Sequence, residues 1–126
     1  MKNKTVAAGL PAHLPGIDLP EVRQILEAAP NAAVLIDEAY FEVCGVTALG
    51  ELARFPNLFV SRTFSKAYGM ASMRLGCLFS QAANCAWMHK AQSPYSVNAV
   101  AALAARAAVE GTEYIRGFVD EVLAAR

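Results

Sequence analysis

One lysine, Lys66, stands in a stretch whose residue types could hold a phosphorylated aldehyde. Residues 61–76 read S-R-T-F-S-K-A-Y-G-M-A-S-M-R-L-G, with hydroxyls before the lysine and an arginine on either side. A lysine amine forms a Schiff base with an aldehyde only after losing its proton, which neighbouring cations and burial favour. Thr63 and Ser65 offer hydroxyl donors to a phosphate, and Arg74 could bind it through two parallel hydrogen bonds. Spacing alone leaves open that Lys66 is an ordinary exposed side chain.

A second polar group, D-E-A-Y at 37–40, follows a short apolar run. The carboxylate of Asp37 is the group that keeps a pyridine nitrogen protonated, and Tyr40 could donate its hydroxyl to an oxygen on the same ring. Pyridoxal phosphate (PLP) is a phosphorylated aldehyde that uses its protonated ring as an electron sink. Two alternatives stay open here. Asp37 and Glu38 could form a solvated loop or cap a following helix, and Arg74 could pair with any surface carboxylate.

The elements that must position these residues are short apolar runs. Runs 32–36 and 58–60 are typical of strands buried on both faces of a parallel sheet, and 75–79 reads as a third strand. Both polar groups follow the ends of the first two runs, where open α/β sheets gather their ligands. We therefore expect an α/β fold with a mostly parallel sheet flanked by helices, and with room for one antiparallel strand near 75–79.

Helix signals surround these strands. In D-L-P-E at 18–21, Asp18 can accept from the free amides of the first turn and Glu21 can reach back, which predicts a helix that ends at Pro30. Further helices are expected over 47–54, from about 81 to 92, from 96 to 111, and from 112 onward.

Composition excludes several classes of function. The 126 residues suffice for one domain, and the 11 basic and 11 acidic side chains leave none of the positive surplus that a nucleic-acid partner needs. No apolar run approaches the roughly 20 residues that span a bilayer. Three cysteines without C-x-x-C spacing predict buried thiols in a reducing cytoplasm, with neither disulfides nor zinc. His13 and His89 lack companions for a metal site, so we expect no metal.

The two polar stretches together resemble the fold-type I, class I/II PLP-dependent aminotransferases, and most of all the histidinol-phosphate branch. The resemblance rests on A-V-L-I-D-E-A-Y-F-E and F-P-N-L-F-V-S-R-T-F-S-K-A-Y-G-M-A-S-M-R-L-G, and runs from about residue 18 to 109. It implies that Lys66 carries PLP as an internal aldimine and later shuttles protons. It also implies that Asp37 pairs with the pyridinium nitrogen and Tyr40 with the ring oxygen. The residues implied to hold or flank the phosphate are Thr63, Ser65 and Arg74.

The same resemblance implies an enzymatic activity and indicates which part of a family member this chain corresponds to. An amino group would move between an amino donor and a 2-oxo acid, in amino-acid biosynthesis, within a cytoplasmic homodimer or larger oligomer. Family members are far longer than 126 residues, so the chain resembles an internal fragment of the large, PLP-binding domain, a partial three-layer structure. We expect an irregular lead-in over 1–17 and the partial domain over 18–126, with its last helix leading toward a small domain. His13 stands where the family has an asparagine.

Two further readings stay open beside the enzyme. One is a truncated, catalytically inactive module that binds PLP weakly. The other is a structural remnant whose site residues are idle and which gains stability by forming oligomers.

Overall fold

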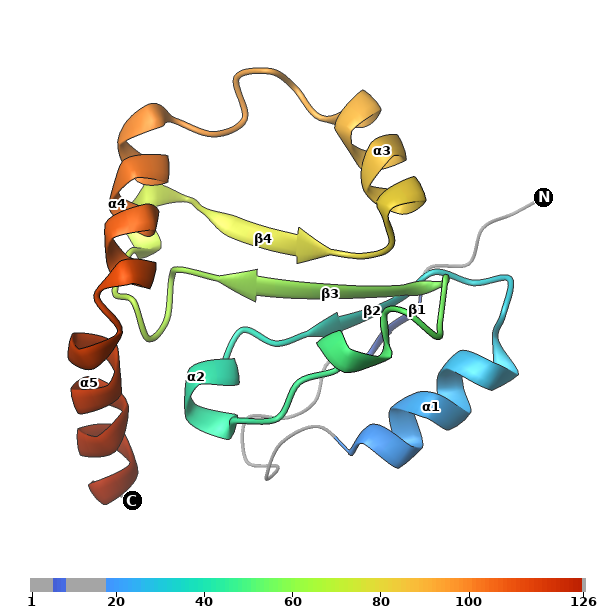
Figure 1. Ribbon diagram of the computed structural model, residues 1–126, viewed down its shortest axis with the longest axis horizontal. Coiled ribbons are helices and arrows are strands. Elements are labelled where there is room, and N and C mark those ends of the chain that lie inside the picture. The colour runs from blue at the N-terminus through green and yellow to red at the C-terminus, as the bar shows by residue number, and fades with distance from the viewer. Residues whose placement is uncertain (1–5, 9–17, 126) are drawn as a thin grey trace.

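The computed structural model describes residues 6–8 and 18–125 and shows an α/β arrangement around one sheet (Figure 1). The strands are β1 (Val6–Ala8), β2 (Val34–Asp37), β3 (Leu58–Thr63) and β4 (Gly76–Phe79), and they lie in that order across the sheet. β1, β2 and β3 run parallel, whereas β4 runs antiparallel to β3. The predicted α/β class and the antiparallel strand near 75–79 are both confirmed.

β1 corrects one part of the sequence prediction. The lead-in over 1–17 was expected to be irregular, yet Val6–Ala8 pairs in parallel with residues 34–36. The sheet of the described residues therefore has four strands where the sequence predicted three. A run as short as V-A-A carries little strand preference of its own, and its order comes from pairing with a neighbour. His13 and the rest of the lead-in lie outside the described residues.

Helices follow the predicted pattern except around residues 41–54. Asp18 caps the first helix as expected, because its side chain accepts from the amide of Glu21 at 3.3 Å. The helix predicted over 47–54 is reduced to one 3₁₀ turn, η1 (Leu49–Glu51), in front of which the Thr47 hydroxyl accepts from the amide of Leu49. The helical elements are α1 (Leu19–Ala28), α2 (Phe41–Cys44), η1 (Leu49–Glu51), η2 (Ala71–Met73), α3 (Ala82–Ala91), α4 (Ala99–Glu110) and α5 (Thr112–Ala124).

The core lies between α1 and one face of the sheet. Leu26 of α1 and Leu58 of β3 are among its most deeply buried side chains. On the opposite face, Leu35 and Phe59 are only half-buried. In the part of the chain that the structure describes, the outer layers of the expected three-layer fold thus cover this second face only in part. The buried cluster consists of Val22, Leu26, Val34, Ile36, Ala48, Phe55, Leu58 and Val60.

The last helices stand at the carboxyl ends of β2 and β3. Figure 1 shows both arrowheads pointing toward α4 and α5, and α5 contacts both α2 and α4. The side chains of β4 and the last three helices leave much apolar surface open. The large apolar side chains exposed there are Leu78, Trp87, Met88, Val100, Leu103, Val109, Tyr114, Phe118 and Leu123.

Cys44 and Cys77 are exposed and Cys85 is half-buried, so the expectation of buried thiols was wrong. Both exposed thiols lie on short elements with little protein around them, α2 and the edge strand β4. Within residues 18–125 and 6–8, no helix is long and apolar enough to cross a membrane.

Candidate active site

The ends of β2 and β3 bring the first two polar groups together. Asp37 is the register partner of Ser61, and the hydroxyl of Ser61 donates to Oδ1 of Asp37 at 3.1 Å. The same oxygen accepts from the amide of Ala39, also at 3.1 Å, which turns the chain out of the sheet. Among the described residues, no hydrogen bond reaches the second carboxylate oxygen. An exposed carboxylate oxygen at the strand end is therefore free to accept from a ligand.

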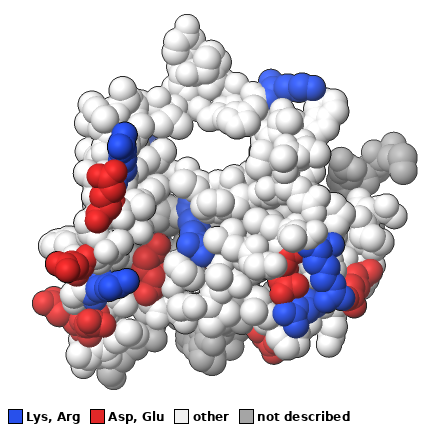
Figure 2. All heavy atoms as spheres, viewed as in Figure 1, with Lys and Arg blue, Asp and Glu red and all other residues white. Residues whose placement is uncertain are grey.

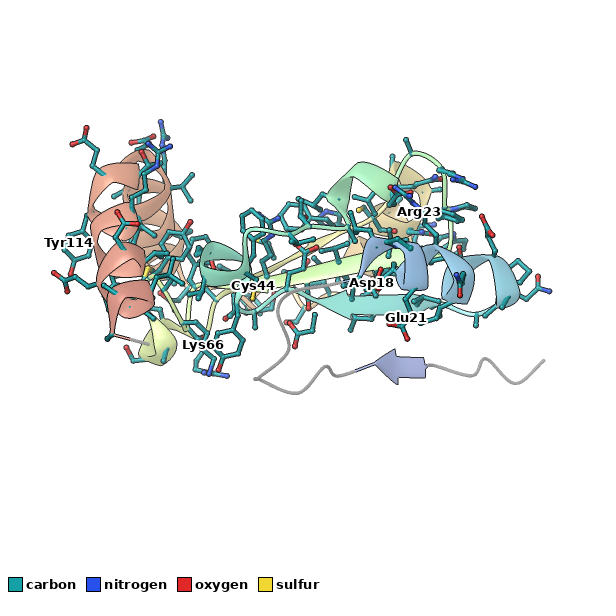
Figure 3. All side chains as sticks on the ribbon, turned by 90° about the horizontal axis from the view of Figure 1, so that it is seen from below. Asp18, Glu21, Arg23, Cys44, Lys66 and Tyr114 are labelled. Atoms are coloured by element: carbon teal, nitrogen blue, oxygen red, sulfur yellow. The ribbon has the colours of Figure 1, made fainter. Side chains whose placement is uncertain are left out.

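Lys66 and Tyr40 lie close to each other although they belong to different connections. Nζ of Lys66 is 5.3 Å from the centre of the Tyr40 ring, within the range of a cation–π contact. Both side chains are exposed. In Figure 3, Lys66 projects from the end of the molecule nearer to α5, well away from Asp18 and Arg23 at α1. The contact joins the turn after β2 to the loop after β3.

The loop that carries Lys66 is held by its own backbone. The hydroxyl of Thr63 accepts from the amide of Ser65 at 3.1 Å, and the carbonyl of Lys66 accepts from the amide of Gly69 at 2.8 Å. Gly69 has a φ of +65°, a left-handed conformation that side chains disfavour. The amide of Phe64 then donates to the carbonyl of Leu75 at 3.2 Å, which closes the loop. This hydrogen bond holds the two ends of the loop, Phe64 and Leu75, next to each other.

The backbone of Arg74 lies beside the point where the loop closes, whereas its side chain is directed toward the carbonyl of Ala71. The residue precedes Leu75 at the loop closure and adopts a left-handed conformation with a φ of +53°. Its Nη1 donates to the carbonyl of Ala71 at 3.0 Å, and the side chain is exposed. Among the described residues, no hydrogen bond connects its guanidinium to Ser65 or Lys66. Its phosphate-binding role stays a prediction.

Two residues that were not among the predicted site residues, Glu38 and Arg62, form a partly buried ion pair beside the site. Glu38, expected in a solvated loop, is 3% exposed, and its Oε2 lies 2.9 Å from Nη2 of Arg62. Arg62, one of the two arginines that flank Lys66 in the sequence, is neutralised by this carboxylate, and its guanidinium lies 3.5 Å from the centre of the Phe41 ring. The alternation of side chains along β3 was the available signal, because it places Arg62 on the face opposite Ser61.

A separate groove of about 460 Å³ lies between β4 and α3. The surface in Figure 2 is hollowed in this region, which β4, α3 and α4 surround in Figure 1. Its lining contains none of the predicted site residues, so this groove and the Lys66 site are distinct. The lining residues are Gly76, Leu78, Ser80, Cys85, Met88, His89, Ala91 and Gln92.

The fold and the paired strand-end groups together define an α/β protein of the aminotransferase fold. The structure matches the histidinol-phosphate aminotransferase of Clostridium acetobutylicum with a TM-score of 0.79 and 28% identity, over 91% of this chain and 37% of that one. It also matches the Sinorhizobium meliloti histidinol-phosphate aminotransferase in complex with pyridoxal-5'-phosphate, with a TM-score of 0.68 and 26% identity, over 77% of this chain and 28% of that one.

The chain belongs to the aminotransferase class I and II family, whose model matches residues 16–125. It is 36% identical over 109 residues to the dihydroxyacetone phosphate transaminase of Campylobacter jejuni, covering 86% of this chain and 30% of that protein. It is 38% identical over 101 residues to the histidinol-phosphate aminotransferase of Lactiplantibacillus plantarum, covering 77% of this chain and 28% of that protein. The chain thus spans under a third of the length of these curated relatives.

Proposed function

We propose that the chain supplies the PLP-binding lysine segment of a histidinol-phosphate-type aminotransferase, which moves an amino group between an amino donor and a 2-oxo acid. The observation that carries the proposal is the meeting of Lys66 with Tyr40 at the carboxyl ends of β2 and β3, where Asp37 also stands. Family membership and the PLP complex among the structural neighbours support it. We further propose a cytoplasmic setting and a homodimer or larger assembly.

The residues at this place fit PLP in their chemistry. A pyridinium N–H needs a carboxylate acceptor, and the second oxygen of Asp37 is available among the described residues. An aldehyde needs a primary amine, and the exposed Lys66 presents one. A phosphate needs N–H and O–H donors, which Thr63 and Ser65 carry as hydroxyls, whereas the Arg74 guanidinium is bonded to the carbonyl of Ala71 and would have to turn to reach the site. By residue type, the set therefore matches all three polar parts of the cofactor.

Each residue would perform one task toward the cofactor. PLP, when bound, supplies an electron sink at its protonated ring. Asp37 would hold the proton on the ring nitrogen, fixed in place by its hydrogen bonds from Ser61 and Ala39. Tyr40 would donate its hydroxyl to the ring oxygen. Lys66 would hold the cofactor through its aldehyde carbon, with the aldehyde oxygen released as water, and would later accept and return a proton at Nζ.

One observation favours a second candidate, an inactive PLP-binding or oligomeric remnant. Lys66, Asp37 and Tyr40 are all exposed to solvent, and so is much apolar surface on β4 and the last three helices. Water weakens the electrostatic interactions on which such a site depends. A chain in this state would need further protein, such as a second copy, to cover the site and the apolar side chains before it could turn over substrate.

A PLP titration of the purified chain tests the proposal. The chain is incubated with PLP, the imine is reduced with borohydride, and the labelled peptides are mapped. Saturable labelling that prefers Lys66 over Lys90, a lysine on α3, is the expected result. Lys66→Ala serves as the control and should remove the saturable absorbance. Adding an amine donor and a 2-oxo acid then distinguishes the enzyme, which loses and regains colour, from the inactive module, which does not.

Labelling spread equally over Lys66 and Lys90 would reject cofactor binding by this site. Sedimentation of the same sample addresses the assembly. A stable monomer at concentrations of tens of micromolar would reject the homodimer.

A further inference from the structure

The side chain of Glu38 is fully buried, and its carboxylate accepts hydrogen bonds from three different residues. The hydroxyl of Thr47 donates to both oxygens, at 3.0 and 2.8 Å, and the amide of Ala48 donates to Oε1 at 2.6 Å. Nε and Nη2 of Arg62 lie 3.0 and 2.9 Å from Oε2. A buried carboxylate satisfied in this way is a rigid connector between chain segments. Here it connects the end of β2, residues 47–48 and β3.

This ion pair sits directly behind the proposed cofactor residues. Glu38 follows Asp37 in the chain, and its amide donates to the carbonyl of Ser61 at 2.9 Å. Arg62 lies between Ser61 and Thr63 on β3. Since neighbouring side chains of a strand point to opposite faces, Asp37 and Ser61 occupy one face of the sheet and Arg62 the other.

The two aromatic residues at the start of α2 are divided in the same way, one toward the ion pair and one toward the candidate site. Phe41 packs against the guanidinium of Arg62, 3.5 Å from the ring centre, while the preceding residue, Tyr40, faces Lys66. Arg62 also donates from Nη2 to the hydroxyl of Thr47 at 2.9 Å. The planar guanidinium thus has fixed partners on its edge and on its face, which a lysine at the same position could not reproduce.

We propose that Glu38 and Arg62 are positioning residues, which hold the ends of β2 and β3 so that Asp37, Tyr40 and Lys66 keep the spacing PLP needs. The inference rests on the proposed function. Neither residue touches the cofactor in this arrangement. Their effect passes through the strand ends, because small displacements of a binding group reduce its contribution steeply.

The test compares Glu38→Gln, which keeps the shape of the side chain and removes its charge, with Glu51→Gln. The control makes the same change in the Arg23–Glu51 ion pair, which joins α1 to η1 and contacts none of the site residues. PLP labelling at Lys66, relative to Lys90 in the same sample, is the readout. We expect the apparent PLP affinity at Lys66 to fall by about tenfold in Glu38→Gln and by less than twofold in Glu51→Gln.

A second variant guards against a failure to fold. Phe41→Leu keeps an apolar contact with Arg62 but removes the ring face, and we expect a smaller loss of PLP affinity at Lys66, of about threefold. If Glu38→Gln is unfolded, the PLP affinity of Phe41→Leu at Lys66 is the measurement that tests the inference. Unchanged affinity in the folded variant overturns the inference.

Hydrogen exchange gives a readout that needs no cofactor. The amides of Ala39 and Ser65 donate to the side chains of Asp37 and Thr63, so their protection reports the geometry of the two strand ends. Their exchange should accelerate by about tenfold in Glu38→Gln and stay unchanged in Glu51→Gln. If the wild-type chain shows no preference for Lys66, the proposed function fails and this comparison alone decides the positioning inference. Equal exchange in both variants overturns it.

Discussion

The ring of Tyr40 lies 5.3 Å from Nζ of Lys66 and joins two motifs that the sequence keeps apart. One motif follows β2 and the other follows β3, and their meeting depends on the parallel pairing of these strands. A shift of one residue in that register would turn the side chains of β3 to the opposite face. The candidate site is therefore a property of strand pairing as much as of the motifs themselves.

Replacing Asp37 by Asn separates the charge of the side chain from its hydrogen bonds. The amide oxygen of Asn can still accept from Ala39 and Ser61, so the free energy of unfolding should change by less than about 0.5 kcal/mol. PLP affinity at Lys66 should fall about tenfold, or 1.4 kcal/mol, because the ring nitrogen loses its anionic partner. Denaturant unfolding and the PLP titration measure the two effects. A stable variant with unchanged PLP affinity would reject the role of Asp37.

Removing the side chain of Arg62 should lower the free energy of unfolding substantially. In Arg62→Ala the carboxylate of Glu38 stays buried without its cation, which costs about 3–5 kcal/mol. The matched control is Arg54→Ala, which breaks the exposed pair with Glu27 and should cost at most about 1 kcal/mol. Urea unfolding of both variants measures the difference. Equal losses would show that the buried pair contributes no more than the surface pair.

Gly76 tolerates no side chain where β3 and β4 meet. A Cβ at this position would lie 2.9 Å from the carbonyl oxygen of Arg62, so Gly76→Ala forces the two strands apart. We expect a loss of about 1–3 kcal/mol in the free energy of unfolding. Gly50→Ala is the control, because a Cβ there meets nothing within 4 Å. Thermal unfolding measured by circular dichroism compares the two, and similar midpoints would contradict the steric argument.

The ion pair between Arg23 and Glu51 should make stability depend on acid pH. The hydrogen bond from Arg23, aided by its charge, lowers the pKa of Glu51 below its usual value. The stabilisation is present above the ordinary glutamate pKa of about 4.3 and is lost as the pH falls through the lower folded-state pKa. Glu51→Gln should remove this part of the pH dependence. Urea unfolding of both proteins between pH 3 and 7 provides the check, and parallel curves would reject the assignment.

Sequence reasoning succeeded where a local signal was strong. The capping pattern at Asp18 predicted the start of α1, and the continuous apolar runs predicted β2, β3 and β4. It failed at residues 47–54, where one 3₁₀ turn forms and where hydrogen bonds from Thr47 and Ala48 to Glu38 hold the segment, a tertiary contact that local pattern does not report. It also failed at β1, because a strand of three residues is ordered by pairing with its neighbour.

The sequence indicates the residues of the candidate site, but it does not indicate the ion pair that lies behind them. Asp37, Lys66 and Tyr40 could be selected because their types and their places after apolar runs suit an aldehyde cofactor. Glu38 and Arg62 look in the sequence like ordinary charged residues. Burial and pairing across strands far apart in the chain give them their role, and periodicity alone does not report such partners.

By itself, the sequence determined the longer helices, the strands β2 to β4 and the residues that could bind PLP, because propensity, caps and residue chemistry act over a few neighbouring positions. The tertiary structure alone decided that Tyr40 meets Lys66 and that Arg62 is neutralised by Glu38. These relationships depend on strand register and burial. Both arise only when distant segments pack together and exclude water from the charges between them.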